Sequence, residues 1–130
     1  MITIDIMASP ARACPAPNQP APLAATVQEL ASVLGRKLTA YIGGAKSITE
    51  VDRWMLGTDA DTSATGRLRL GFAVVNTLKR YEDKRVVQAW FTGLNPALGE
   101  RSPIRVLREE TPETASSKLM SAARSFLARG

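Results

Sequence analysis

From Thr26 onward, apolar residues recur three or four positions apart, and no stretch alternates apolar and polar residues as a half-buried strand would. Glycines, and serine or threonine followed by proline, divide this pattern into short segments. The spacing therefore predicts an all-α fold with about six or seven helices. We expect helices near residues 26–34, 38–42, 47–56, 66–81, 83–92, 103–109 and 111–129.

Local start signals support several of these helices. Thr26–Glu29 and Ser47–Glu50 each match a capping box, in which a hydroxyl and a glutamate satisfy free amides of the first turn. Ser102 and Thr111 each precede a proline, which is favourable at the first helical position, and Asp83 can cap the helix that follows it. The segment at 66–81 is apolar on more than one side, so we expect it to be central and mostly buried.

Residues 1–25 differ from the rest of the chain. Five of the eight prolines lie between Pro10 and Pro22, and large apolar residues are scarce there. Such a stretch buries too little surface to offset the entropy of ordering it, so it is expected to be a flexible Pro/Ala-rich leader. Cys14 lies in this leader and is interpreted as an incidental exposed thiol.

Composition excludes several classes of function. The chain has no histidine and one cysteine, which excludes Ser/His/Asp triads, Cys/His zinc sites and an internal disulfide. The usual catalytic groups of a small metabolic enzyme are therefore missing, although an enzyme is not excluded outright, and we expect no cofactor and no metal. No apolar run has the roughly 18–20 residues of a membrane span, so a cytoplasmic protein is expected. The net charge of +5 favours anionic partners.

Leu38–Leu56 has the layout of a helix-turn-helix, with a glycine-containing turn before a second capped helix. If that helix entered a major groove, its outward side chains would meet phosphates or bases. The candidate DNA-binding residues are Lys46, Ser47, Thr49 and Arg53. A helical hairpin that only packs is the alternative. Ile48–Leu56 has a net charge of −1, so a monomer is expected to bind DNA weakly.

A second pattern runs from Trp90 to Leu107, W-F-T-G-L-N-P-A-L-G-E-R-S-P-I-R-V-L. Its tryptophan, Asn-Pro-x-Leu turn with glycine and Pro-x-x-x-Leu helix, followed by an amphipathic helix, resemble the C-terminal domain of Xre/MbcA/ParS-type antitoxins. Residues 26–65 and 66–130 then correspond to a helix-turn-helix region and a toxin-binding domain. The chain departs from the pattern at Glu109–Pro112, where the family usually has a glycine-containing turn.

The resemblance implies that the chain is an antitoxin, which covers the active site of a RES-domain toxin that degrades NAD. It also implies autoregulatory binding to operator DNA, and a homodimer or a toxin–antitoxin hetero-oligomer. The candidate toxin-binding residues are Asn95, Pro96, Leu98, Arg101, Pro103, Arg105, Arg124, Arg129 and Gly130. The alternatives are a stand-alone helix-turn-helix transcriptional regulator and a structural adaptor, with an enzyme last.

Overall fold

The structure is a computed structural model that describes residues 22–129. Within this range the chain forms seven α-helices and one 3-10 turn, and the single β-bridge joins Asn95 to Arg101. The all-α prediction is confirmed. The elements are α2 (Leu23–Leu34), α3 (Arg36–Gly43), α4 (Ile48–Met55), α5 (Thr62–Lys79), α6 (Lys84–Thr92), η1 (Pro96–Leu98), α7 (Pro103–Glu109) and α8 (Pro112–Arg129).

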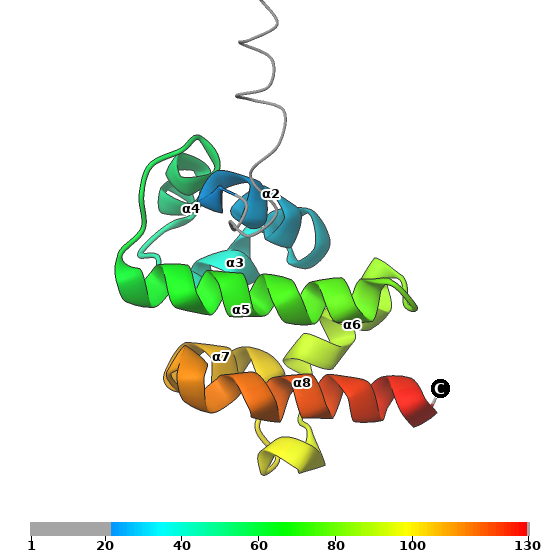
Figure 1. Cartoon of the computed structure of the whole chain (residues 1–130). Coiled ribbons are helices and arrows are strands. Elements are labelled where there is room, and N and C mark those ends of the chain that lie inside the picture. The colour runs from blue at the N-terminus through cyan, green and yellow to red at the C-terminus, as the bar shows by residue number, and fades with distance from the viewer. Residues whose placement is uncertain (1–21, 130) are drawn as a thin grey trace, which may run out of the picture.

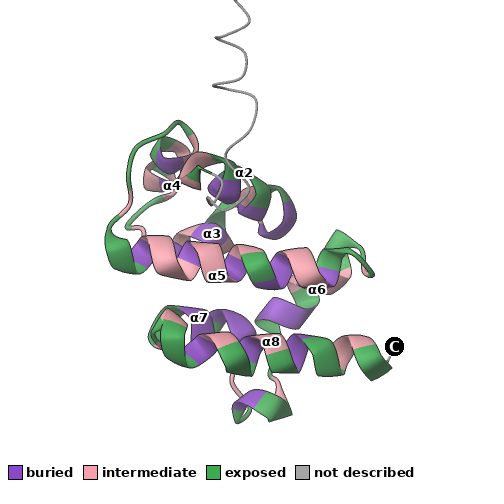
Figure 2. Cartoon of the chain, viewed as in Figure 1, coloured by how far each residue is buried: buried purple, intermediate pink, exposed green. Residues whose placement is uncertain are grey.

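The long helix α5 lies between two groups of helices (Figure 1). Helices α2, α3 and α4 lie on one side of it, and α7, α8 and η1 lie on the other. Contacts join α5 to α2 and α3 in the first group, to α7 and α8 in the second, and to α6, which follows α5 in the chain. Its buried residues recur along its whole length (Figure 2), as the sequence predicted for a central helix. The predicted boundary between residues 65 and 66 falls inside α5.

Two predicted helix starts are wrong. Helix α2 begins at Leu23, because Pro22 precedes its first turn, and Thr26 is instead a buried residue inside the helix. Residues 23–25 are therefore helical and not part of a leader, while the earlier leader residues and Cys14 lie outside the described part of the chain. Helix α5 begins at Thr62 and not near Gly66, because Asp61 Oδ1 accepts a hydrogen bond from the amide of Ala64 at 2.7 Å.

The capping predictions hold elsewhere with one exception. Asp83 and Ser102 accept hydrogen bonds from the first turns of α6 and α7. Ser47 stands at the N-cap of α4, but its hydroxyl makes no capping bond. Glu50 still reaches back across the turn, where its Oε1 accepts from the amide of Lys46 at 3.0 Å. Neither bond of the second capping box is therefore made, because Glu50 bonds the residue before the N-cap and not Ser47 itself.

Asp61 at the start of α5 and Ser47 at the start of α4 make a matched pair for mutation. Asp61→Ala removes the acceptor of the Ala64 amide and is expected to lower the free energy of unfolding by about 1 kcal/mol. Ser47→Ala removes a hydroxyl that caps nothing, so its expected effect is within about 0.5 kcal/mol of zero. Urea unfolding followed by circular dichroism measures both. Equal losses in the two variants would contradict the assigned start of α5.

Helix α3 packs closely under α4. Trp54 from α4 is 3% exposed, and its ring covers Gly43 at the end of α3. Arg67 from α5 completes the same junction, because its guanidinium donates to the carbonyls of Ile42 at 2.7 Å and Gly43 at 3.0 Å. These bonds satisfy carbonyls that the end of α3 leaves without helical partners. The pair of helices α3 and α4 is therefore anchored on the central helix.

Candidate partner-binding surface

The connector between α6 and α7 is held by its own backbone. Asn95 Oδ1 accepts from the amide of Ala97 at 2.9 Å, and the Asn95 carbonyl accepts from the amides of Leu98 at 2.9 Å and Glu100 at 3.0 Å. Leu98 and Pro103 are buried, so they fix the connector onto the core. Pro96 is exposed. Of the predicted toxin-binding residues in the connector itself, Pro96 is therefore exposed, Asn95 is half-buried and Leu98 is buried.

The arginines around α7 have partners inside the chain. Arg101 forms an ion pair with Glu110, which Lys118 also contacts at 2.9 Å. Arg105 pairs with Glu109 at 2.8 Å along the exposed side of α7. A third arginine, Arg108, stacks 5.0 Å from the centre of the Tyr41 ring. Arg101 and Arg105, both predicted to bind a toxin, are thus already engaged in ion pairs within the chain.

Glu110 gives this cluster a pH dependence. Hydrogen bonds from Lys118 and then Arg101 hold the pKa of its carboxyl below the ordinary value. Because the folded-state pKa is depressed, the stabilisation is complete above the unfolded value of about 4.3 and is lost as the pH falls through the folded-state pKa. Glu110→Gln should therefore lower the free energy of unfolding by about 1 kcal/mol at neutral pH.

The difference between the parent chain and Glu110→Gln should shrink to nothing in acid, and unfolding curves at several pH values measure it. Glu113→Gln is the matched control, since Glu113 is exposed and has no ion pair among residues 22–129. A difference that stays constant down to about pH 2 would show that charge pairing is not its cause.

A different situation holds at the C-terminal ends of α5 and α8, which lie at the same end of the molecule (Figure 1). Arg80, Arg124 and Arg129 are exposed there, and none makes a hydrogen bond or ion pair within the described residues. Of the predicted toxin-binding arginines, Arg124 and Arg129 are therefore available to a partner. The predicted residue Gly130 lies outside the described part of the chain.

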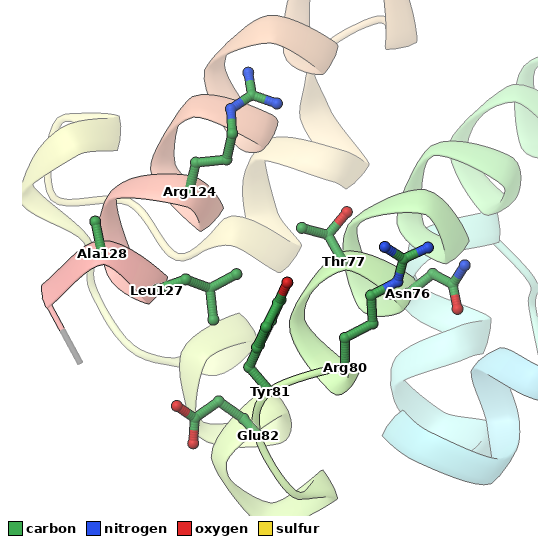
Figure 3. A pocket seen from close by; sticks show the side chains of 8 residues that line it. All are labelled: Asn76, Thr77, Arg80, Tyr81, Glu82, Arg124, Leu127 and Ala128. Carbon is green, nitrogen blue, oxygen red and sulfur yellow. The ribbon is translucent and has the colours of Figure 1, made fainter.

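A pocket of about 810 Å³ opens between these helix ends. Figure 3 shows Tyr81 standing between Leu127 of α8 and Thr77 of α5, with Arg124 and Arg80 on its two sides. Tyr81 is 71% exposed, which is unusual for a large aromatic side chain. The lining residues are Asn76, Thr77, Arg80, Tyr81, Glu82, Arg124, Leu127 and Ala128.

A second, smaller pocket of about 220 Å³ lies where α8 meets the connector, and Arg129, Phe126, Asn95 and Pro96 help to line it. Leu94, at its edge, is 73% exposed. Around the C-terminal half of α8 and the end of α5 there are therefore two pockets that share no lining residue, three arginines unpaired within the described residues, and two exposed large side chains. We call this set, Arg80, Tyr81, Leu94, Arg124, Leu127 and Arg129, the C-terminal surface.

The sequence did not point to Arg80 or Tyr81. The helical pattern placed both inside a helix extending to residue 81, but α5 ends at Lys79. The available signal was a charged and aromatic pair two residues after Leu78, the last buried apolar residue of that helix.

The four candidate DNA-binding residues all lie on the open side of α4 and its turn. Lys46, Ser47, Thr49 and Arg53 are exposed, as a recognition helix requires. Acidic residues accompany them: Glu50 lies in the same turn, and Asp52 pairs with Arg36 at 3.2 Å. This face therefore carries little excess positive charge for phosphates.

Among residues 22–129, no three acidic or cysteine side chains gather as metal ligands would. Nor is any described helix both long and apolar enough to cross a bilayer.

Comparison with known proteins gives one structural likeness. No protein-family model matches the chain, and no curated protein matches it either. The fold is similar to that of a chain in the crystal structure of the M. tuberculosis MbcT-MbcA toxin-antitoxin complex, with a TM-score of 0.62 and 23% sequence identity. The match covers 79% of this chain and 95% of that chain. The two chains thus share their all-α fold over nearly the whole of the solved one.

Proposed function

We propose that this chain is an antitoxin, which binds a partner toxin through the C-terminal surface and has no catalysis of its own. The observation that carries the proposal is the fold shared with a chain of a toxin-antitoxin complex. The C-terminal surface supports it, because three arginines without partners and exposed Tyr81 and Leu94 have the composition of a protein interface.

The finer proposal is that the partner is a RES-domain toxin that degrades NAD, and that the last turns of α8 cover its active site. The motif from Trp90 to Leu107 supports this choice of partner. Hydrogen bonds around Asn95 hold the connector that carries the motif in one conformation before binding, which reduces the entropy lost on association. Both proteins would act in the cytoplasm, as a homodimer or hetero-oligomer of antitoxin with toxin.

Co-expression with the neighbouring reading frame tests both the antitoxin proposal and the assignment of the partner as a RES-domain toxin. We expect a stable complex on size-exclusion chromatography with light scattering, which also gives its stoichiometry. We expect cells that express the neighbour alone to lose NAD and to stop growing, and co-expression of this chain to restore both. Absence of a complex would refute the antitoxin proposal, while a complex without any change in NAD would refute only the RES assignment.

Operator binding is proposed as a second activity, because Lys46, Ser47, Thr49 and Arg53 are exposed together around α4. We expect specific retention of the upstream DNA in a gel shift, stronger for the toxin–antitoxin complex, since an assembly doubles the contacts. Arg53→Glu should abolish retention and leave toxin neutralisation intact. Tight, specific binding by the isolated chain with no toxin partner would instead favour a stand-alone transcriptional regulator.

A further inference from the structure

The pocket between the C-terminal ends of α5 and α8 has two cationic side chains that nothing in the described chain neutralises. Arg80 comes from the end of α5 and Arg124 from α8, and both line the pocket of about 810 Å³. Because they come from separate helices, they flank the opening from two sides (Figure 3). We propose that this pocket receives an acidic segment of the partner protein, an inference that rests on the proposed antitoxin function.

The distribution of ion pairs supports an acidic occupant. At the other end of α8, Arg101 and Lys118 share the carboxylate of Glu110, and Arg105 pairs with Glu109. At the pocket, Glu82 is the single acidic residue in the lining, and its side chain points away from both arginines (Figure 3). Guanidinium groups bind carboxylates through paired, charge-assisted hydrogen bonds, so an Asp or Glu from outside would supply the missing partners.

The rest of the lining suits a protein segment. Leu127 is half-buried against the core, and Tyr81 presents most of its ring to the opening. An apolar side chain next to the partner's carboxylate would pack against these two residues, and such aromatic and arginine contacts dominate many interfaces. Nucleic acid fits this pocket less well. Its phosphates are bound by more than two cations, whereas the pocket supplies two and its wall also carries an acidic residue and apolar side chains.

Charge reversal in the full-length chain tests the inference, with the purified product of the neighbouring reading frame as the probe. Arg80→Glu combined with Arg124→Glu should raise the dissociation constant about 100-fold, measured by titration calorimetry. The matched control is Lys37→Glu combined with Arg85→Glu, which makes the same change in net charge at exposed residues that line none of the pockets described above. The control should change the dissociation constant less than about threefold.

The variant Glu82→Gln tests whether the segment that occupies the pocket is acidic or basic. Removing this carboxylate should tighten binding of an acidic segment by about two- to fivefold, whereas it would weaken binding of a basic one. Arg124→Lys adds a chemical readout, because a carbodiimide joins a lysine amine to a carboxylate with which it pairs. We expect a cross-link from position 124 to an Asp or Glu of the partner by mass spectrometry, and none from the control Arg85→Lys.

The outcomes separate the two proposals. A complex that tolerates the Arg80/Arg124 reversal overturns this inference but leaves the antitoxin proposal standing. A reversal that abolishes DNA retention and spares the protein complex overturns it in favour of a nucleic-acid site. If the neighbouring product forms no complex with the parent chain, the proposed function fails and this inference fails with it.

Discussion

Replacing Gly43 with alanine is expected to lower the free energy of unfolding by about 2–3 kcal/mol. A Cβ at this position would lie 2.6 Å and 2.7 Å from two carbons of the Trp54 ring, far inside van der Waals contact. The ring is rigid and almost fully buried, so it has no free space to move into. The junction of α3 with α4 must therefore open, and the midpoint of thermal unfolding should fall by about 10 °C.

Gly71→Ala is the matched control, since it also adds one methyl group at a buried helical glycine. A Cβ at Gly71 would lie 3.5 Å from carbons of Ile42 and Leu107, which is ordinary contact. Alanine favours the helix by about 1 kcal/mol over glycine, so this variant should be as stable as the parent chain or more so. If both variants lose stability equally, the close approach of Trp54 to Gly43 is not what determines the effect.

Truncation after Ala123 is expected to weaken binding of the partner toxin by at least about 100-fold while the fold survives. The deletion removes Arg124, Leu127 and Arg129, and with them the α8 side of the C-terminal surface. It keeps the fully buried Leu119, which a shorter truncation product would lose. Loss of the half-buried Phe126 and Leu127 should lower the free energy of unfolding by about 1–3 kcal/mol.

A stability control is needed because a weaker fold could also bind less. Leu38→Ala removes a half-buried apolar side chain from the first group of helices, with a comparable expected cost in unfolding free energy. It should leave the affinity for the partner within about threefold of the parent value. Circular dichroism at the temperature of the binding assay checks that both variants are folded. Equal losses of binding would mean that stability, not the C-terminal surface, governs the affinity.

The fold was largely predictable because helical spacing and caps are local signals. Asp83 and Ser102 start their helices as the sequence predicted. The starts of α2 and α5 were missed for opposite reasons. The capping-box pattern at Thr26 predicts a boundary but lies inside α2, and the residues that follow Asp61 are mostly polar, so the apolar spacing predicts a later start for α5. In both cases a short local signal marks the start, Pro22 before the first turn of α2 and the Asp61 cap of α5, and the apolar spacing does not reveal it.

The candidate surface was less predictable, because a sequence does not show which charges neutralise one another. Arg101 and Arg124 are equivalent as sequence features, yet the first pairs with Glu110 and the second faces a pocket without a partner. Leu98 and Pro103 belong to the recognised motif, but their burial gives them a role in fixing the connector. Only the arrangement of α5 beside α8 brings Arg80 and Arg124 together.

The position of α5 has a consequence for how the molecule opens. Since this helix contacts both groups of helices, its central amides are exposed to solvent only when the whole chain unfolds. Their hydrogen exchange should thus be the slowest in the molecule and report global unfolding. A protein bound at the C-terminal surface stabilises the folded state as a whole, so it should slow the exchange of these central amides further, although it touches only the end of α5.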